Sequence, residues 1–267
     1  MNNNYKESFD QMKIAGSLAA ETLDEITSYV KPGVTTEKLD KIWYEFIRDN
    51  GGYSAPLFYR GFPKSCCTSV NHTICHGIPS IKYLKEGDII NIDVTAVVNG
   101  WHGDTSRMFF VDEVSVKGKN LVNVTYESMM KAISIIKDGI CLGDIGETIQ
   151  TYVEKEGFSV VRDFCGHGIG KIFHEPPNIL HYGKKGTGMK IESGMIFTVE
   201  PMINEGISDT KLLKDGWTAV TKDKSLSAQF EHTIGVTDNG FEIFTKSKKK
   251  YDQPPYQVWL KDIQEVK

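Results

Sequence analysis

Apolar residues recur every three or four positions in residues 5–30 and again in about 35–50, which predicts two amphipathic helices. The first is expected to stop at Lys31-Pro32-Gly33 and the second at Asn50-Gly51-Gly52, because proline and glycine interrupt helices. Short apolar runs separated by turn residues follow from residue 54 to residue 81 and predict strands and loops. The N-terminal part therefore carries two helices ahead of a sheet.

The most strongly patterned part of the chain is a β-hairpin centred on Asn99-Gly100. A run rich in Ile and Val precedes the turn, the apolar run Met108-Phe109-Phe110-Val111 follows it, and Asn-Gly is the preferred pair of a two-residue type I′ turn. This turn places Thr95 opposite Asp104, and the two-residue period of a strand places Asp93 on the same face as Thr95. Asp93 and Asp104 become diagonal neighbours, with Cβ atoms about 7–8 Å apart, unless a bulge at Gly103 shifts the register. Two such carboxylates share cations or repel each other, and an ordinary hairpin with solvated aspartates explains this segment alone equally well.

The order of helices and strands repeats further along the chain. Two helices are expected again at about 119–136 and 145–157, and the spacing of glycine and carboxylate in 87–93 recurs in 194–200, at an offset of 107 residues. Two units are too few for a solenoid. We therefore predict an α+β fold with two pseudo-symmetric halves, an antiparallel sheet inside and helices outside.

The repeat also sets the expected boundaries of the molecule. A single domain at 1–250, halves at about 1–118 and 119–250, and a short tail at 251–267 are expected. A pseudo-twofold axis would bring equivalent strands together, so that Asp93 and Glu200 lie close to each other at the centre.

Composition excludes several classes of protein. The chain is 40% hydrophobic and 25% charged, and its net charge of −4 gives no reason to expect general nucleic-acid binding. No apolar run reaches about 18 residues, so no membrane span is expected, and the polar N-terminus lacks a secretory signal. The five cysteines are irregularly spaced, which is typical of reduced thiols in the cytoplasm. We expect a soluble cytoplasmic protein.

The second half contains further polar groups within apolar segments. Glu231 begins a β-branched run, residues 231–236, which we expect to face another strand at 217–221. An acidic side chain in a buried strand is costly unless it is paired or bound to a cation. His167 lies at the centre of Gly166-His167-Gly168-Ile169-Gly170, a loop whose spacing does not fit a phosphate-binding motif.

Four carboxylates and one imidazole thus emerge as candidate metal ligands: Asp93, Asp104, His167, Glu200 and Glu231. Such a hard, oxygen-rich set suits Co(II), Mn(II), Fe(II) or Zn(II) in a dinuclear centre. Four carboxylates neutralise two divalent ions, and two ions about 3.5–4 Å apart hold the hydroxide nucleophile of many hydrolases.

These residues and the sequences around them resemble the methionine aminopeptidases of peptidase family M24, in their short bacterial, type 1 form. The resemblance covers about residues 5–245. Its motifs are Pro63-Lys64-Ser65-Cys66-Cys67-Thr68-Ser69-Val70-Asn71, Cys75-His76-Gly77-Ile78-Pro79, Asn91-Ile92-Asp93-Val94, His102-Gly103-Asp104-Thr105-Ser106, Cys165-Gly166-His167-Gly168-Ile169-Gly170, Phe173-His174-Glu175-Pro176-Pro177, Phe197-Thr198-Val199-Glu200-Pro201 and Gln229-Phe230-Glu231-His232-Thr233.

The resemblance implies a "pita-bread" fold and a metalloexopeptidase that removes the initiator methionine of new proteins when the second residue is small. It implies that Asp93 chelates one metal ion, that His167 and Glu200 chelate the other, and that Asp104 and Glu231 bridge both. Glu200 would also carry a proton from the bridging water to the leaving amine.

The resemblance also implies roles for residues outside the ligand set. His174 would polarise the scissile carbonyl and stabilise its oxyanion, and His76 would contact the substrate near the scissile amide nitrogen. The methionine side chain would lie in an apolar pocket suited to thioether–aromatic contacts. The pocket residues are expected to be Tyr59, Phe62, Cys67, Phe173 and Trp217. The chain departs from the family at Phe62, where Tyr is frequent, and near Pro56, where a second Cys is frequent.

The remaining histidines are interpreted as structural. They are His72, His102, His181 and His232. His102 and His232 are expected to brace neighbouring carboxylates.

Two alternative functions fit the sequence less well. An Xaa-Pro aminopeptidase or prolidase carries a large additional N-terminal domain, for which the stretch before the first hairpin leaves no space. A non-catalytic relative that binds protein or RNA would lack some metal ligands, whereas all are present here. The 31 positions from Glu200 to Glu231 also leave no room for the helical insertion of type 2 enzymes.

Some properties stay open at this stage. A monomer is expected, because no pattern demands a dimer, and the metal and the residues tolerated after methionine are undecided. The Lys-rich segment 246–250 is either a solvated tail or a contact to ribosomal RNA, since clustered lysines attract phosphate.

Overall fold

The computed structural model describes residues 5–256 of the 267-residue chain, so most of the expected tail, 257–267, lies outside the described residues. The helices of the described part are α1 (Lys6–Ile26), η2 (Thr27–Tyr29), α2 (Thr36–Asp49), η3 (Tyr59–Gly61), α3 (Val116–Ser134) and α4 (Leu142–Lys155), where η denotes a 3-10 helix. Both predicted pairs of α-helices are confirmed. None of the described helices is long and apolar enough to cross a membrane.

Capping explains why the second pair begins earlier than predicted. Ser115 precedes α3, and its hydroxyl accepts a hydrogen bond from the Gly118 backbone N–H at 3.1 Å. At α4, the Asp144 carboxylate accepts the backbone N–H of Cys141 at 2.9 Å. These bonds satisfy backbone donors that a helix start otherwise leaves unpaired, so each helix begins ahead of its first periodic apolar residue.

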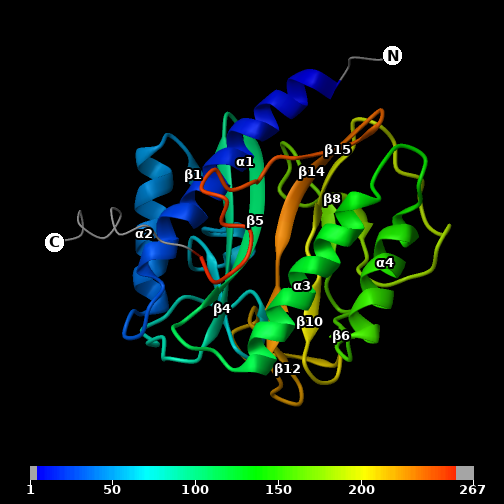
Figure 1. Cartoon of the computed structure of the whole chain (residues 1–267). Helices are drawn as coiled ribbons and strands as arrows, with labels where there is room; N and C mark the ends of the chain where they lie inside the picture. The colour runs from blue at the N-terminus through cyan, green and yellow to red at the C-terminus, as the bar shows by residue number, and fades with distance from the viewer. Residues whose placement is uncertain (1–4, 257–267) are drawn as a thin grey trace.

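An antiparallel sheet of nine strands occupies the centre of the described structure (Figure 1). Its main path is β1 (Tyr53–Ser54), β4 (Ile89–Val98), β5 (Trp101–Phe110), β14 (Glu231–Thr237), β9 (Ile196–Val199), β7 (Gly166–Gly168) and β8 (Glu175–Ile179). Beside this path, β2 (Cys67–Val70) pairs with β4, and β15 (Gly240–Ile243) pairs with β14. The predicted α+β class with an antiparallel sheet is confirmed.

Two small sheets complete the architecture. One contains β13 (Ser227–Gln229), β10 (Met202–Asn204) and β6 (Ser159–Val160), and the other contains β11 (Thr210–Leu212), β12 (Ala219–Thr221) and β3 (Thr73–Cys75). Every pairing within them is antiparallel.

The hairpin of β4 and β5 has the predicted register. Val98 pairs with Trp101 and Thr95 with Asp104, and the turn residues Asn99 and Gly100 have φ of 52° and 77°, as a type I′ turn requires. Pairing continues without a bulge at Gly103. Glycine is required at residue 103 for another reason. Helix α1 crosses β5 so closely that a Cβ at this residue would overlap the backbone of Ala15.

One prediction about strand neighbours is wrong. Residues 231–236 were expected to face 217–221, but β14 pairs with β5, β9 and β15, whereas β12 pairs with β3 and β11. The reason is burial: side chains on both faces of β14 are buried, so this strand takes a central place in the large sheet.

The two halves meet in a way that refines the expected symmetry. Strands β5 and β14 meet at the centre, with Ser106 opposite Glu231, while β4 and β9 lie one strand further out on either side. The strands that carry or precede Asp93 and Glu200 therefore do not pair with each other. We propose that β4–β5 and β9–β14, with their helix pairs, are the cores of the halves expected at about 1–118 and 119–250.

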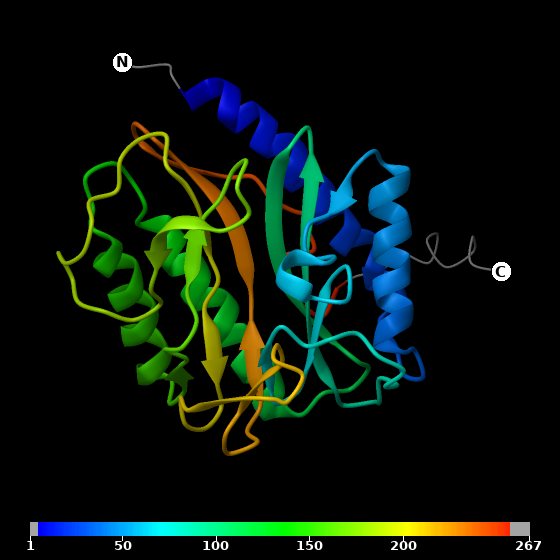
Figure 2. The same cartoon turned by 180° about the vertical axis from the view of Figure 1, so that it is seen from behind.

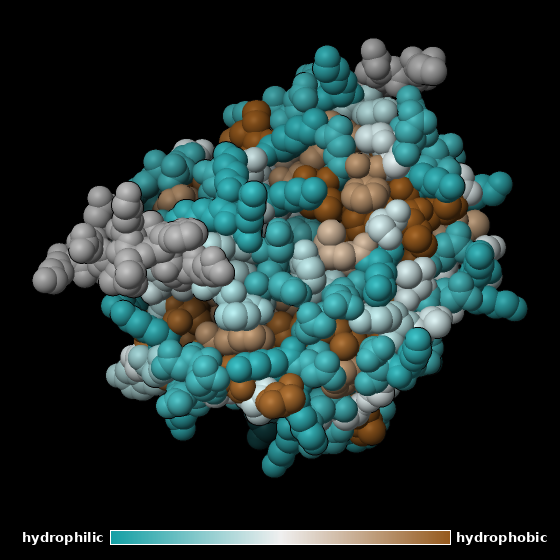
Figure 3. Space-filling view, viewed as in Figure 1, coloured by the Kyte–Doolittle hydropathy of each residue, from teal (hydrophilic) through white to brown (hydrophobic). Residues whose placement is uncertain are grey.

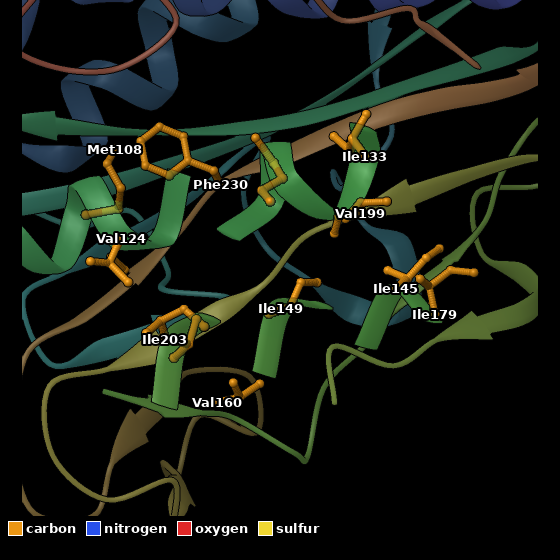
Figure 4. Packing of buried hydrophobic residues seen from close by; sticks show 14 of the residues in the cluster. Met108, Val124, Ile133, Ile145, Ile149, Val160, Ile179, Val199, Ile203 and Phe230 are labelled. Atoms are coloured by element: carbon orange, nitrogen blue, oxygen red, sulfur yellow. The ribbon is translucent and has the colours of Figure 1, made fainter. Parts of the chain in front are cut away.

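The helices cover one side of the large sheet. Figure 1 shows α1, α3 and α4 in front of the strands, and Figure 2, from behind, shows strands and loops facing the viewer. One apolar cluster joins α3 and α4 to the sheet and includes Val124, Ile149 and Val199 (Figure 4). A second cluster joins α1 and α2 to β4 through residues such as Leu23 and Trp43. The outer surface of the helices is mostly hydrophilic (Figure 3), so the core lies between helices and sheet and leaves the other side of the sheet for a site.

The close contact of α1 with β5 gives a test of the fold. The substitution Gly103→Ala is expected to lower the free energy of unfolding by about 1–3 kcal/mol, because the added Cβ forces α1 away from the sheet. Urea unfolding of the metal-free proteins, followed by circular dichroism, measures this difference. Gly240→Ala is the matched control, since nothing lies within 4 Å of a Cβ there. Equal stabilities of the two variants would contradict the assigned helix–sheet packing.

Candidate metal centre

All five predicted metal ligands line one cavity of about 330 Å³. Asp93 lies on β4, Asp104 on β5, His167 on β7 and Glu231 at the start of β14, while Glu200 directly follows β9. His167 was expected in a loop, and this detail is wrong because residues 166–168 pair with β8 and β9. Residues from both halves of the chain therefore converge on one point of the sheet.

The distances show how tightly these groups are gathered. The Nε2 atom of His167 lies 3.6 Å from Oδ2 of Asp104 and 3.7 Å from Oε1 of Glu200. One ligand atom each of Asp104, His167 and Glu231 lies within 4.8 Å of the others, which is a spacing that one metal ion could bridge. Asp93 contributes to the same cavity from the neighbouring strand.

The protonation state of His167 favours metal binding. Burial lowers the pKa of this imidazole to about 4, so the ring is neutral at pH 7. Its Nδ1 atom lies 3.0 Å from the carbonyl oxygen of Gly168, an acceptor, so Nδ1 carries the hydrogen. The lone pair of Nε2 therefore points toward carboxylate oxygens, an arrangement that is unfavourable unless a cation lies between them.

The carboxylates give the same indication. Burial raises the pKa of Asp93 to about 7. It also raises the pKa values of Asp104, Glu200 and Glu231 well above their ordinary range, and for these three neighbouring carboxylates add to the effect. No Lys or Arg among residues 5–256 forms an ion pair with any of the four. Buried carboxylates of this kind are stabilised by divalent cations, so the residues present fit a metal centre.

Hydroxyl groups that the sequence analysis did not identify fix the carboxylates in place. Thr95 donates a hydrogen bond to Oδ1 of Asp104 at 2.7 Å, and Thr198 donates one to Oε1 of Glu200 at the same distance. The Thr198 hydroxyl also accepts the backbone N–H of His167 at 3.0 Å. Strand periodicity offered a signal for both threonines, because Thr198 lies two residues before Glu200 and Thr95 directly opposite Asp104.

Further contacts orient Glu200. Its Oε2 atom accepts a hydrogen bond from the Gln229 side chain at 3.3 Å, and its backbone N–H donates to Nε2 of His181 at 3.2 Å. His181, which was expected to be structural, thus holds the backbone next to a candidate ligand. No short-range pattern in the sequence relates residue 181 to residue 200.

The expected roles of two other histidines as braces of carboxylates are wrong. Nδ1 of His102 lies 2.9 Å from the carbonyl oxygen of Gly170, and Nδ1 of His232 lies 2.9 Å from the hydroxyl of Thr245. Both histidines hold neighbouring segments together. His232 directly follows Glu231, and adjacent residues of a strand point to opposite faces, whereas His102 lies two residues before Asp104 but has its Nδ1 atom directed to Gly170.

His76 and His174 both reach the cavity, as expected. Nδ1 of His174 lies 3.1 Å from the hydroxyl oxygen of Tyr59, and the two rings stack at 5.2 Å. Burial and the nearby histidines lower the pKa of His174 to about 3, so this ring is also neutral. His76 has a positive φ of 55° and packs edge-on against Trp217 at 6.1 Å.

An apolar pocket adjoins the ligands in the same cavity. The five expected pocket residues all line it, namely Tyr59, Phe62, Cys67, Phe173 and Trp217. Phe62 and Trp217 meet edge to face at 5.2 Å, and Tyr59 lies 4.9 Å from Phe173. Lining residues that the sequence analysis did not identify are Pro56, Arg60, Phe164, Cys165 and Met202.

A neutral imidazole and four buried carboxylates beside an apolar pocket are the equipment of a metal-dependent hydrolase. Residues 10–238 match the model of the family described as metallopeptidase family M24. With this match and the relatives described next, the chain belongs to the methionine aminopeptidases of family M24.

The relatives cover nearly the whole chain. A methionine aminopeptidase from Rickettsia prowazekii is 60% identical over 252 residues, which are 94% of this chain and 97% of that protein. One from Escherichia coli K12 is 53% identical over 244 residues, 91% of this chain and 92% of that protein.

Solved structures agree with the fold. The crystal structure of the Rickettsia prowazekii methionine aminopeptidase has a TM-score of 0.89, and the match covers 90% of this chain and 97% of that one at 60% identity. A prolidase from Pyrococcus furiosus shares the fold alone, at 20% identity and a TM-score of 0.74, and this chain covers 65% of it.

The pKa shifts predict how metal binding depends on pH. The pKa of Asp93 is higher in the folded, metal-free protein than in the unfolded chain, so its contribution to stability is lost as pH rises from about 4 to about 7. Metal ions bind the deprotonated carboxylates and so stabilise the folded protein. Their stabilising effect is therefore largest above about pH 7, where the stability contributed by Asp93 has been lost. Excess Mn(II) is expected to raise the unfolding temperature by about 5–10 °C at pH 7.5 and clearly less at pH 5.5.

Thermal unfolding with Mn(II) or with a chelator, at both pH values, tests this expectation. In the Asp93→Asn variant the effect of Mn(II) should be weaker and should depend less on pH. Equal stabilisation of the unsubstituted protein at both pH values would contradict the interpretation.

Proposed function

We propose that this chain removes the initiator methionine from proteins whose second residue is small, using two divalent metal ions. The observation that carries the proposal is the position of the neutral His167 Nε2, 3.6 and 3.7 Å from the carboxylates of Asp104 and Glu200, at the end of an aromatic pocket. The names of the relatives from Rickettsia prowazekii and Escherichia coli support the same reaction.

The five candidate ligands would hold two metal ions between them. We propose that Asp93 holds one, that His167 and Glu200 hold the other, and that Asp104 and Glu231 contact both. Their donor atoms suit Co(II), Mn(II), Fe(II) or Zn(II). When bound, such ions lower the pKa of water and polarise a carbonyl group.

Glu200 is proposed to carry the proton during the reaction. Its two oxygens accept hydrogen bonds from Thr198 and Gln229, which hold the carboxylate in one orientation. In the metal-free protein, burial raises the pKa of this carboxyl group. Glu200 would take a proton from the attacking water and pass it to the amine of the leaving chain.

His174 is proposed to stabilise the negative charge that develops on the carbonyl oxygen. The ring is neutral, and the Tyr59 hydroxyl can donate to its Nδ1, which leaves Nε2–H as a donor toward the substrate. His76, which lines the same cavity, is proposed to contact the scissile amide nitrogen.

The pocket accounts for the choice of methionine. Phe62, Trp217, Tyr59 and Phe173 surround it with aromatic rings, and Cys67 adds a sulfur atom. An unbranched thioether side chain fits between such rings and gains sulfur–aromatic contacts. A β-branched side chain has no such freedom to adjust.

The proposed setting is the cytoplasm, where new polypeptides present their N-termini. We propose that the chain acts as a monomer, because no pattern in its sequence demands a dimer. A contact of segment 246–250 with ribosomal RNA stays a hypothesis, and it is weakened because Lys248 is already paired with Glu21.

The reaction is tested by release of free methionine from Met-Ala-Ser. We expect metal-stripped protein to be inactive and to regain activity with one or more of Co(II), Mn(II), Fe(II) and Zn(II). Leu-Ala- and Ala-Pro-starting peptides should be cleaved about 100-fold more slowly, because their first side chains do not fill the methionine pocket.

The Glu200→Gln variant should lose at least a thousandfold in kcat, since it removes a ligand and the proton carrier together. Glu205→Gln is the matched control, because Glu205 does not line the cavity and pairs with Lys117. Failure of every metal to restore cleavage of Met-Ala-Ser by folded protein would refute the proposed function.

A further inference from the structure

The mouth of the cavity carries a basic group that the proposed chemistry does not use. Arg60 is exposed and lines the same cavity as the metal ligands, in which it is the single Lys or Arg among the described lining residues. Its guanidinium carbon lies 5.3 Å from the centre of the Tyr59 ring, in a cation–π contact. The charge is therefore held at one place on the rim.

The backbone of this rim is rigidly built. Phe58 and Arg60 have φ of 66° and 48°, a region that residues with a side chain seldom adopt. The turn is closed by a hydrogen bond from the Phe58 N–H to the Phe62 carbonyl at 2.8 Å and one from the Phe62 N–H to the Tyr59 carbonyl at 2.9 Å. Tyr59 thus turns inward to His174 while its neighbours face solvent. Strain of this kind persists where the surrounding structure fixes it, and often at sites of ligand binding.

The position of Arg60 relative to the proposed reaction can be estimated from ring contacts. The Tyr59 ring contacts both groups, with its centre 5.3 Å from the guanidinium carbon of Arg60 and 5.2 Å from the centre of the His174 ring, so these two groups lie at most about 10–11 Å apart, the length of roughly three extended residues. An extended peptide advances about 3.3 Å per residue. If His174 contacts the carbonyl of the first residue, the side chain of the third or fourth residue reaches the guanidinium. Figure 2 shows the segment of η3, in cyan, on the side of the sheet that faces away from α3 and α4.

We propose that Arg60 is a specificity-determining residue that binds an acidic side chain at the third or fourth position of the substrate. The inference rests on the proposed function, because it assumes that the first residue of a peptide lies at the metal ligands. It adds a preference that the methionine pocket does not supply. When two divalent ions are bound they balance the four carboxylates, so Arg60 is the basic side chain among the described lining residues that can attract an acidic chain.

The test uses tetrapeptide amides of the type Met-Ala-Asp-Gly and Met-Ala-Gly-Asp, each beside its Asn counterpart. Amidation removes the terminal carboxylate, and Asp and Asn differ in charge but hardly in size. We expect kcat/KM for the Asp peptide of at least one pair to exceed that for the Asn peptide by about two- to fivefold, as a partly exposed ion pair supplies. The excess should shrink in 500 mM NaCl because salt screens the pair.

Variants of Arg60 separate charge from shape. In Arg60→Gln the Asp/Asn ratio should fall to about one, in Arg60→Glu it should fall below one, and Arg60→Lys should retain part of it. Lys171→Gln is the matched control, because Lys171 also stacks on an aromatic ring, that of Trp101 at 5.3 Å, but does not line this cavity. Its ratio should equal that of the unsubstituted protein.

The outcomes distinguish this inference from the function on which it rests. Cleavage with the same Asp/Asn ratio in the unsubstituted protein and in Arg60→Gln would overturn the role of Arg60 and leave the proposed function intact. A ratio of one in the unsubstituted protein would do the same. Absence of methionine release from every peptide would overturn both.

Discussion

The structure depends on one electrostatic constraint, the burial of four carboxylates and a neutral imidazole around one cavity, where no Lys or Arg of residues 5–256 forms an ion pair with the carboxylates. Burial removes water from these carboxylates and raises the pKa of all four, and repulsion between neighbouring carboxylates raises the pKa values of Asp104, Glu200 and Glu231 further. The orientation of His167, with its lone pair toward two of the carboxylates, adds to it. Divalent cations relieve both costs at once, so the centre is built for a ligand that the protein itself does not supply.

The fold preorganises the ligand side chains through contacts within the protein itself. Helices pack on one side of the sheet, and their apolar clusters hold β5 and β14 together at the centre. Hydroxyl groups of Thr95 and Thr198 then fix individual carboxylate oxygens. Preorganisation of this kind keeps the ligands in place, and the same rigidity extends to Tyr59 and His174 beside them.

Local chemistry in the sequence predicted much of this arrangement, and long-range pairing was the part it could not supply. The Asn99-Gly100 turn determines the register of its hairpin, so the opposition of Thr95 and Asp104 followed from a few neighbouring residues. The partners of β14 depend on which surfaces the whole fold buries, and the expected pairing with 217–221 was wrong for that reason. The contact between His181 and Glu200 likewise joins segments with no shared pattern. The family resemblance supplied the roles of His76 and His174, which no spacing rule in a single sequence provides.

The central claim is that the buried carboxylates and His167 bind two metal ions, and anomalous X-ray diffraction from crystals of Mn(II)-loaded protein tests it most directly. Two anomalous peaks about 3.5–4 Å apart are expected in the cavity, with Asp104 and Glu231 in contact with both and His167 in contact with one. A single peak in the cavity, or none, would contradict it.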